Sequence, residues 1–407
     1  MGTNHAVRPA RALPGPGPGR PGPGTGLAAA GTRAGAQAAA EVGVAGLPGL
    51  GRRRVVVLVG LAGLLLAAVL AGTGAGAVRL SPAEILAVLI RWAGGDAAAG
   101  PGAGAGAGPA ARILLDIRLP RVLLAGLVGA SLAAAGGAFQ TLFRNPMADP
   151  YVLGVSSGGA LGAAVGFILL TAPGDGPAAV ARAAGFGLVP VCAFAGAVAA
   201  VALVRRLAQV RGRLPVTTLL LAGVAVAALL GALVSLLVYL SGERLRPLVF
   251  WLLGSLSGAG WREVAVAACA AAAGLGILVA QSRALNALWL GEEAAYHLGV
   301  DVEAVKRRLL VAGSLLTATA VSVSGVIGFV GLMVPHAVRL LVGGDHRVLL
   351  PGSVLAGAAV LIACDTVARV VLAPAELPVG VVTALVGAPC FLYLLRTHVA
   401  GRGDGGL

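Results

Sequence analysis

Long runs of apolar residues recur along this chain and constrain it to a bundle of membrane helices. Of its 407 residues, 58% are hydrophobic and only 11% are charged, whereas soluble domains are roughly 25% charged. A helix that crosses a bilayer needs about 20 apolar residues. The runs therefore predict an all-α integral membrane protein with about ten transmembrane helices.

The ten expected helices follow one another from the first apolar run almost to the C-terminus. The third of them carries Gly158, Gly162 and Gly166 on one face, a spacing that lets two helix backbones approach closely. The expected ranges are about 55–72, 121–143, 153–170, 188–207, 218–240, 264–281, 309–324, 327–342, 354–372 and 379–395.

The composition divides the chain into a tail, a membrane domain and a second short tail. Residues 1–51 are rich in Pro, Gly and Ala and are expected to be disordered. Residues 52–397 form the expected ten-helix domain, in which residues 94–111 are a flexible external insert. Residues 398–407 are expected to be a short C-terminal tail.

Arginines cluster at one set of helix ends and predict the orientation. Arg52, Arg53 and Arg54 precede the first apolar run, which reads either as a signal peptide or as a retained helix. The length of the run favours a retained helix, and the positive-inside rule then places both termini in the cytoplasm. The net charge of +14 has no aromatic-interleaved basic patch with it, so nucleic acid is not an expected partner.

The residues that could bind metal or hydrolyse nucleotide are absent or scattered. The cysteines and histidines have no ligand spacing, so we expect no metal site, no disulfide and no cofactor. The single lysine, Lys306, follows Val305, so the chain lacks a phosphate-binding P-loop and we expect no catalytic residue. Pro335 and His336 suggest a histidine switch or a metal ligand, but no second ligand lies nearby, which favours a packing or helix-breaking role.

A cytoplasmic connection at residues 283–308 is the candidate contact for a separate energy source. Within it, Glu293, Ala294, Ala295 and Gly299 predict a short amphipathic helix closed by glycine. Such a helix either docks a partner or lies as an ordinary helix at the membrane interface.

Several motifs, collinear from about residue 55 to 397, resemble the FecCD family of ABC permeases. The resemblance implies a type II ABC importer permease fold that works with ABC ATPase subunits, a second permease copy and an extracytoplasmic solute-binding protein. ATP would be bound by the ATPase subunits alone. The motifs are RLPR (118–121), RNPMADP (144–150), LLLAGVAV (219–226), LGEEAAYHLGV (290–300), GVIGFVGLMVPHAVRLLVGGDHRVLLPGSVLAGA (325–358) and ELPVGVVTALVGAPCFLYLL (376–395).

The same resemblance implies three sets of site residues. Arg118, Arg121 and Arg369 match arginines that dock acidic residues of the binding protein; alternatively, the first two anchor lipid headgroups and Arg369 pairs with Asp365 in its own helix. Val216 and Thr217 match the cytoplasmic gate, where the family uses small hydroxyl residues, so Val216 departs from the pattern. The coupling residues that contact the ATPase are Leu290, Gly291, Glu292, Glu293, Ala294, Ala295, Leu298 and Gly299.

The expected function is import of a ferric siderophore, or a related iron chelate, haem or cobalamin, across the cytoplasmic membrane of a bacterium. An ion-gradient-driven secondary transporter is the alternative, but it would need ionisable residues at mid-membrane. The expected helices are nearly free of acid, with Asp365 near a helix end. A passive channel would need no docking loop for an ATPase.

Overall fold

The computed structural model describes residue 2 and residues 48–76, 80–94, 108–171, 187–241 and 246–403. Contacts divide the chain into residues 1–52 and 53–407. Most of the tail expected at 1–51 and of the insert expected at 94–111 lies outside the described residues. Within the second unit the described residues are helical, with no strand among them.

Each of the ten apolar runs lies in a helix, as predicted, and short helices join some of them. The described elements are α2 (Pro48–Gly74), α3 (Pro82–Ala93), α4 (Pro109–Arg112), η3 (Ile113–Arg118), α5 (Leu119–Leu142), η4 (Pro150–Leu153), α6 (Val155–Thr171), α8 (Leu188–Ala208), α9 (Val216–Ser241), α10 (Arg246–Leu252), α11 (Trp261–Ala280), α12 (Ser282–Leu290), α13 (Glu292–His297), α14 (Val302–Ser324), α15 (Val330–Val342), α16 (His346–Val370) and α17 (Val379–Gly403).

Six of the described helical segments are long and apolar enough to cross a membrane, and three shorter ones are apolar. The long ones include α2, α8, α9, α11 and α16, and the sixth runs from Pro109 through α5. The shorter ones are α6, α15 and α17. The remaining expected helix, at 309–324, is α14, whose first turns carry Glu303, Lys306 and two arginines before the chain becomes apolar.

The helix that we expected to begin at about Arg121 begins instead at Pro109. Its π-helical segment η3 joins α4 to α5 without a break. Both Arg118 and Arg121 are buried inside the fold, where they have internal partners, so neither charge ends the helix. At the other end of the chain, α17 continues to Gly403, beyond residue 397 where we expected the tail to begin.

The helix α3 was not expected, although its local signal is strong. The Ser81 hydroxyl accepts a hydrogen bond from the Glu84 N–H at 3.2 Å, and the Glu84 carboxylate accepts one from the Ser81 N–H at 2.7 Å. This capping box satisfies two of the donors at the helix start, and Pro82 occupies the first helical position.

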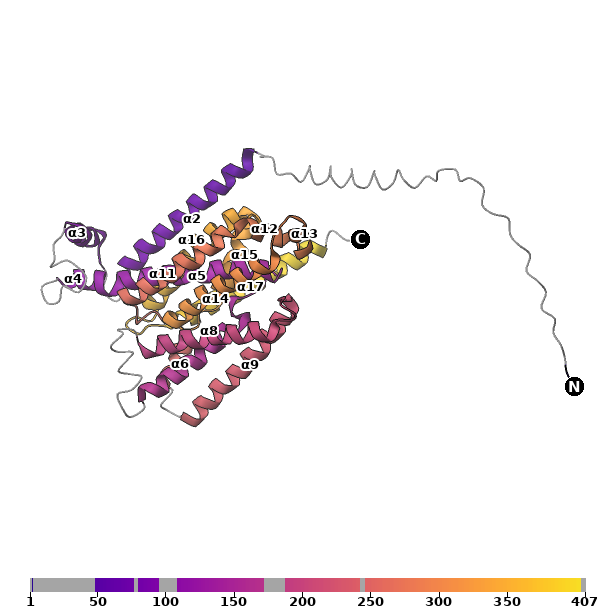
Figure 1. Ribbon diagram of the computed structural model, residues 1–407. Coiled ribbons are helices and arrows are strands. Elements are labelled where there is room, and N and C mark those ends of the chain that lie inside the picture. Colours follow the sequence, from indigo (N-terminus) through magenta and orange to yellow (C-terminus); the bar gives the residue numbers. More distant parts are fainter. Residues whose placement is uncertain are drawn as a thin grey trace. The chain divides into compact units, whose positions relative to one another are not determined.

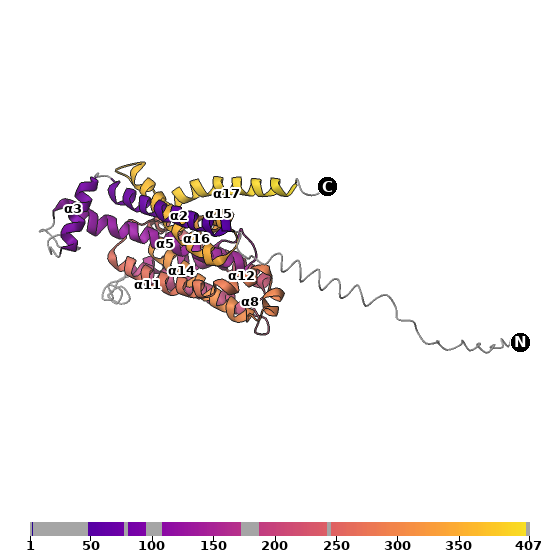
Figure 2. The same ribbon diagram turned by 90° about the horizontal axis from the view of Figure 1, so that it is seen from above.

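The two ends of the helical unit differ in what they carry (Figures 1 and 2). In both views α3 lies at one end and α12 at the other. We call the end with α12 and α13 the hairpin end. We call the opposite end, which carries Arg118 and Arg121, the arginine end.

The helix α5 lies at the centre of this unit and packs on α11, α14, α15 and α16. It touches α16 and α15 backbone to backbone. A Cβ at Gly129 would overlap the Gly357 carbonyl, and one at Gly136 would overlap the Gly331 carbonyl. Such contacts require glycine, because any side chain would separate the helices.

The proline in α15 does not break the helix, contrary to one of the roles that we expected for Pro335 and His336. The helix runs through Pro335 from Val330 to Val342. A proline inside a helix leaves the carbonyl four residues earlier without its N–H partner. Here that carbonyl belongs to Gly331, and it lies against the bare face of Gly136. His336 is buried in the same helix, consistent with a packing role.

The glycine face predicted in the third helix is a packing surface, as expected. In α6, a Cβ at Gly162 would overlap the Cys192 carbonyl of α8, and one at Gly158 would press on Gly196 and Ala200. The helix α9 packs on both α6 and α8. Together these three helices form one side of the unit (Figure 1).

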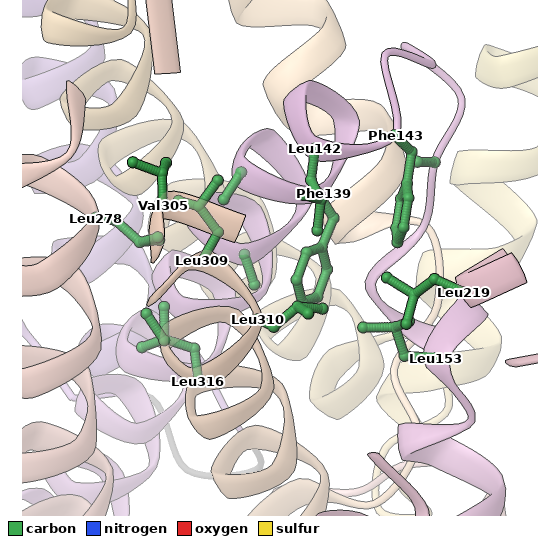
Figure 3. Close-up of a cluster of buried hydrophobic side chains, with 14 of the residues drawn as sticks. Phe139, Leu142, Phe143, Leu153, Leu219, Leu278, Val305, Leu309, Leu310 and Leu316 are labelled. Atoms are coloured by element: carbon green, nitrogen blue, oxygen red, sulfur yellow. The ribbon is translucent and has the colours of Figure 1, made fainter. Parts of the chain in front are cut away.

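A hydrophobic cluster joins the helices toward the hairpin end (Figure 3). Phe139 of α5 lies between α14 residues such as Leu310 and the side chains of Leu153 and Leu219 from η4 and α9. Leu278 of α11 lies beside Leu309. The same cluster includes side chains of α12 and α13, so the hairpin end is part of the core.

Replacing Gly162 with valine is expected to destabilise the protein by about 1–3 kcal/mol or more, because the new side chain overpacks the α6–α8 contact. Gly276→Val in α11 is the matched control, since nothing lies within 4 Å of a Cβ built there. Thermal unfolding of the purified variants in detergent measures the difference. Equal melting temperatures would contradict the close contact.

Candidate functional site

A helical hairpin, residues 282–299, projects at one end of the unit. It consists of α12, the turn residue Gly291, α13 and the closing residue Gly299. Gly291 has φ 126° and Gly299 has φ 79°, values that favour glycine. Both glycines therefore set the two sharp changes of direction that make α13 a separate short helix, as the sequence predicted.

The hairpin is anchored to the bundle by apolar and ionic contacts. Leu285 and Ala295 are fully buried in the hydrophobic cluster. The Lys306 ammonium of α14 donates hydrogen bonds to Glu292 at 2.6 Å, to Glu303 at 3.3 Å and to the Leu214 carbonyl at 3.2 Å. Because the Lys306 side chain is only 3% exposed, this charge is fully committed to holding α13 and the start of α9 against α14.

The outer face of the hairpin is apolar and unusually exposed. Leu290, Tyr296 and Leu298 have exposed fractions of 66%, 73% and 65%. Beside them lies a hollow of about 820 Å³, whose lining includes Tyr296, Arg213 and the carboxylates of Glu292, Glu293, Asp301 and Glu303. This arrangement of apolar side chains beside charged groups is suited to contact with another protein.

The arginines at the opposite end, which we predicted as docking residues, are buried. Arg118 donates to the Thr73 and Gly74 carbonyls at 2.9 and 3.0 Å, and Arg369 donates to the Gly72 and Ala75 carbonyls at 2.9 and 3.1 Å. These carbonyls belong to the last turn of α2 and the residue after it. The two arginines therefore cap the C-terminus of that helix, where a cation is favoured.

Two carboxylates complete this network of charges. Asp365 accepts hydrogen bonds from the Nε and Nη2 of Arg121 at 3.0 and 2.9 Å, and its other oxygen lies 3.0 Å from the Nε of Arg369. Arg121 also donates to Glu376 at 2.8 Å. The pair within α16 that we considered for Arg369 is thus present, and Asp365 is shared with Arg121.

The arginine network nevertheless opens to the surface. A hollow of about 220 Å³ is lined by Arg118, Arg121, Arg369 and Glu376 together with apolar side chains. The Glu376 side chain is 42% exposed, whereas that of Asp365 is 1% exposed. An incoming carboxylate would therefore meet the arginines beside Glu376, and Asp365 would remain inside.

The predicted gate residues lie at the start of α9, at the hairpin end. Val216 is half-buried against the hydrophobic cluster and Thr217 is exposed. Among the described residues, no three His, Cys, Asp or Glu side chains are grouped so that they could hold a metal ion.

Apart from the pair of Arg369 with Asp365, reasoning from the sequence missed the partners of the predicted residues. Lys306 was noted only as a lysine outside a P-loop, and Glu376 only as part of a motif. The spacing of Glu303 and Lys306, three residues apart at a helix start, was an available signal. The contacts of Arg121 with Asp365 and Glu376 cross more than 240 residues of sequence, and no local pattern indicates them.

Among the described residues, six long apolar helical segments and three shorter ones, with the hairpin at one end and the arginine network at the other, define a multi-pass membrane protein. A model of the FecCD transport family matches residues 64–397, and the chain belongs to this family.

Two relatives and one solved structure illustrate the similarity. The cobalamin import system permease protein BtuC of Halobacterium salinarum is 52% identical over 284 residues, which cover 70% of this chain and 73% of that protein. The hemin transport system permease protein HmuU of Yersinia pestis is 46% identical over 284 residues, covering 70% and 83%. A structure described as an inward-facing conformation of a metal-chelate type ABC transporter has a TM-score of 0.69 and 32% identity, covering 84% of this chain and 98% of that one.

Replacing Asp365 with alanine is expected to cost roughly 3–5 kcal/mol of stability, because it leaves the buried Arg121 and Arg369 without their shared carboxylate. Glu376→Gln is the control and should cost about 1 kcal/mol or less, since Glu376 is partly exposed and the amide oxygen still accepts a hydrogen bond. Melting temperatures of the purified variants give the comparison. A larger loss for Glu376→Gln would contradict the central place of Asp365.

Proposed function

We propose that this chain is the permease subunit of an ABC importer and that the hairpin, residues 282–299, is where a separate ATPase docks. The observation that carries the proposal is the exposed apolar face of Leu290, Tyr296 and Leu298 on a hairpin that Lys306 fixes to the bundle. Because the hairpin is fixed to the bundle, a displacement of a bound partner would be transmitted to the helices. Membership of the FecCD transport family supports the same function and does not fit an ion-gradient-driven transporter.

The energy for transport comes from the partner, because this chain has no means of binding ATP in a P-loop. Its only lysine, Lys306, follows Val305 and is committed to Glu292 and Glu303. ATP is bound and hydrolysed by ATPase subunits, and the permease itself needs no cofactor. The coupling residues remain those of the LGEEAAYHLGV motif, from Leu290 to Gly299.

The hairpin end faces the cytoplasm in this proposal. Arg54, Arg213, Lys306 and Arg347 all lie at that end, in agreement with the positive-inside rule. The protein then resides in the cytoplasmic membrane of a bacterium with both termini inside. Two permease copies enclose the transport path, and Val216 with Thr217 contribute to its cytoplasmic gate.

The arginine end receives the solute-binding protein. A surface hollow at this end is lined by Arg118, Arg121, Arg369 and Glu376. A guanidinium can bind a carboxylate through two parallel hydrogen bonds. An acidic residue of the binding protein would reach these arginines through the same hollow. Their internal bonds hold them in place for that contact.

The cargo is a large chelate: cobalamin, haem or a ferric siderophore. The support comes from two relatives, a cobalamin import permease and a hemin transport permease, and from the metal-chelate transporter whose fold is shared. The external binding protein selects among such cargoes, so the permease path itself needs few polar contacts.

Replacing Tyr296 and Leu298 together with alanine is expected to weaken ATPase binding about tenfold or more, because the change removes the apolar anchors of the hairpin face. The control is Tyr239→Ala in α9, which removes an 84% exposed tyrosine away from the hairpin. Co-purification of the ATPase with each variant is the measurement. An ATPase that still binds the double variant fully would place the docking surface elsewhere.

Transport is tested with the permease, its ATPase and its binding protein in liposomes, supplied separately with cyanocobalamin, haem or a ferric siderophore. We expect uphill accumulation of one of these cargoes with ATP inside, and no accumulation when an ion gradient replaces ATP. Uphill accumulation by the permease alone, without any ATPase, would overturn the proposed function.

A further inference from the structure

One amide joins the hairpin to the centre of the bundle. The side-chain oxygen of Asn286, on α12, accepts a hydrogen bond from the His346 backbone N–H at 2.8 Å and lies 2.8 Å from its ring Nδ1. The amide nitrogen of Asn286 donates to Asp345 at 2.9 Å. These three contacts of Asn286 with Asp345 and His346, which we call the joint, fix the orientation of the Asn286 side chain.

The His346 ring extends the joint from α12 to α5. Because an amide oxygen only accepts, Nδ1 of His346 carries the proton that faces Asn286. Its Nε2 lies 2.6 Å from the hydroxyl of Thr141, which is also 3.0 Å from the Gly137 carbonyl. In a neutral ring Nε2 accepts, so the single hydroxyl proton of Thr141 is shared between Nε2 and the Gly137 carbonyl. The ring is fully buried, so it bridges the two helices inside the protein.

Charged and aromatic side chains close the outer side of the joint. Burial opposes the ionisation of Asp345, but hydrogen bonds from Asn286 and from the Arg347 N–H, with Arg54 nearby, lower the pKa of its carboxyl overall. Arg339 of α15 lies 4.5 Å above the Trp289 ring of α12, a cation–π contact. The joint therefore binds α12 to α15 and α16 as well as to α5.

The two helices held at this joint are also fastened together at their far ends. Thr141 lies at one end of α5 and Arg121 at the other; His346 begins α16 and Asp365 lies about 28 Å along it at 1.5 Å per residue. The contact between Arg121 and Asp365 closes the far end. Between these points, Gly129 and Gly357 touch backbone to backbone.

We infer that Asn286, His346 and Thr141 are positioning residues that join the hairpin to a two-helix strut, α5 with α16. The strut links the ATPase site to the binding-protein site, an inference that rests on the proposed function. Two helices in backbone contact and fastened at both ends move as one body. A displacement of Arg121 and Asp365 by a docked binding protein then reaches the hairpin, and a displacement of the hairpin reaches the arginine end.

The test measures ATP hydrolysis by the complete transporter in liposomes, with and without loaded binding protein. Thr141→Val, which lies outside the hairpin, is expected to keep ATPase co-purification and basal hydrolysis but to lose stimulation by the binding protein at least about fivefold. Asn286→Ala is expected to lose stimulation by at least as much. Thr317→Val is the matched control for Thr141→Val. Thr317 is also buried and also bonds the carbonyl four residues earlier, but it lies on α14, outside the strut.

An exchange of partners provides a rescue. Asn286→Asp alone places two carboxylates together and should abolish stimulation. Combined with Asp345→Asn, it restores a carboxylate that accepts from His346 and an amide that donates to it, so stimulation should return. A return of stimulation would show that the matched hydrogen bonds at this joint are what is required, and not the identity of either side chain.

The strut is overturned if Asn286→Ala is stimulated like the wild type, if Thr317→Val loses as much stimulation as Thr141→Val, or if Thr141→Val no longer binds the ATPase. These results differ from a failure of the proposed function. In that case the wild-type assembly itself would show no nucleotide-dependent uptake, whatever the variants do.

Discussion

Because Gly129 and Gly136 have no side chains, α5 lies in backbone contact with α16 and α15, and the rest of the bundle is arranged around that contact. Lipid tails are as apolar as leucine, so helices in a membrane associate by close packing instead of by escape from water. The carbonyl that Pro335 leaves without a partner lies in the same contact, against Gly136. The interface between α5 and α15 thus combines close backbone packing with a proline inside a helix.

The buried charges of Lys306, Arg121 and Arg369 have carboxylate partners, which suit a medium of low dielectric constant. At one end Lys306 is held by two carboxylates, and at the other Arg121 and Arg369 share Asp365. A buried cation without such partners would be strongly destabilising. The pairs also keep charge away from the apolar length of the helices, so the ionisable groups gather where the bundle meets water and protein partners.

Much of the fold was predictable from the sequence, because a helix that spans a membrane requires an apolar run of a known length. All ten runs lie in helices, and the small helix α13 was indicated by its closing glycine. The early start of the second helix at Pro109 was missed, since Arg118 and Arg121 looked like residues at the end of a helix. Their partners come from distant segments, and a single sequence holds no local sign of such contacts. For the same reason the docking arginines and the coupling residues were located by a family resemblance, and their roles stay predictions.

The burial of Lys306 has a practical consequence for chemical labelling. The chain contains no other lysine, and this amine is enclosed by Glu292, Glu303 and the Leu214 carbonyl. A lysine-directed reagent added to an assembled complex would therefore modify side chains of the other subunits and spare those of this one. Any lysine adduct on this chain would report that α13 had separated from α14, which makes the residue a built-in probe of hairpin opening.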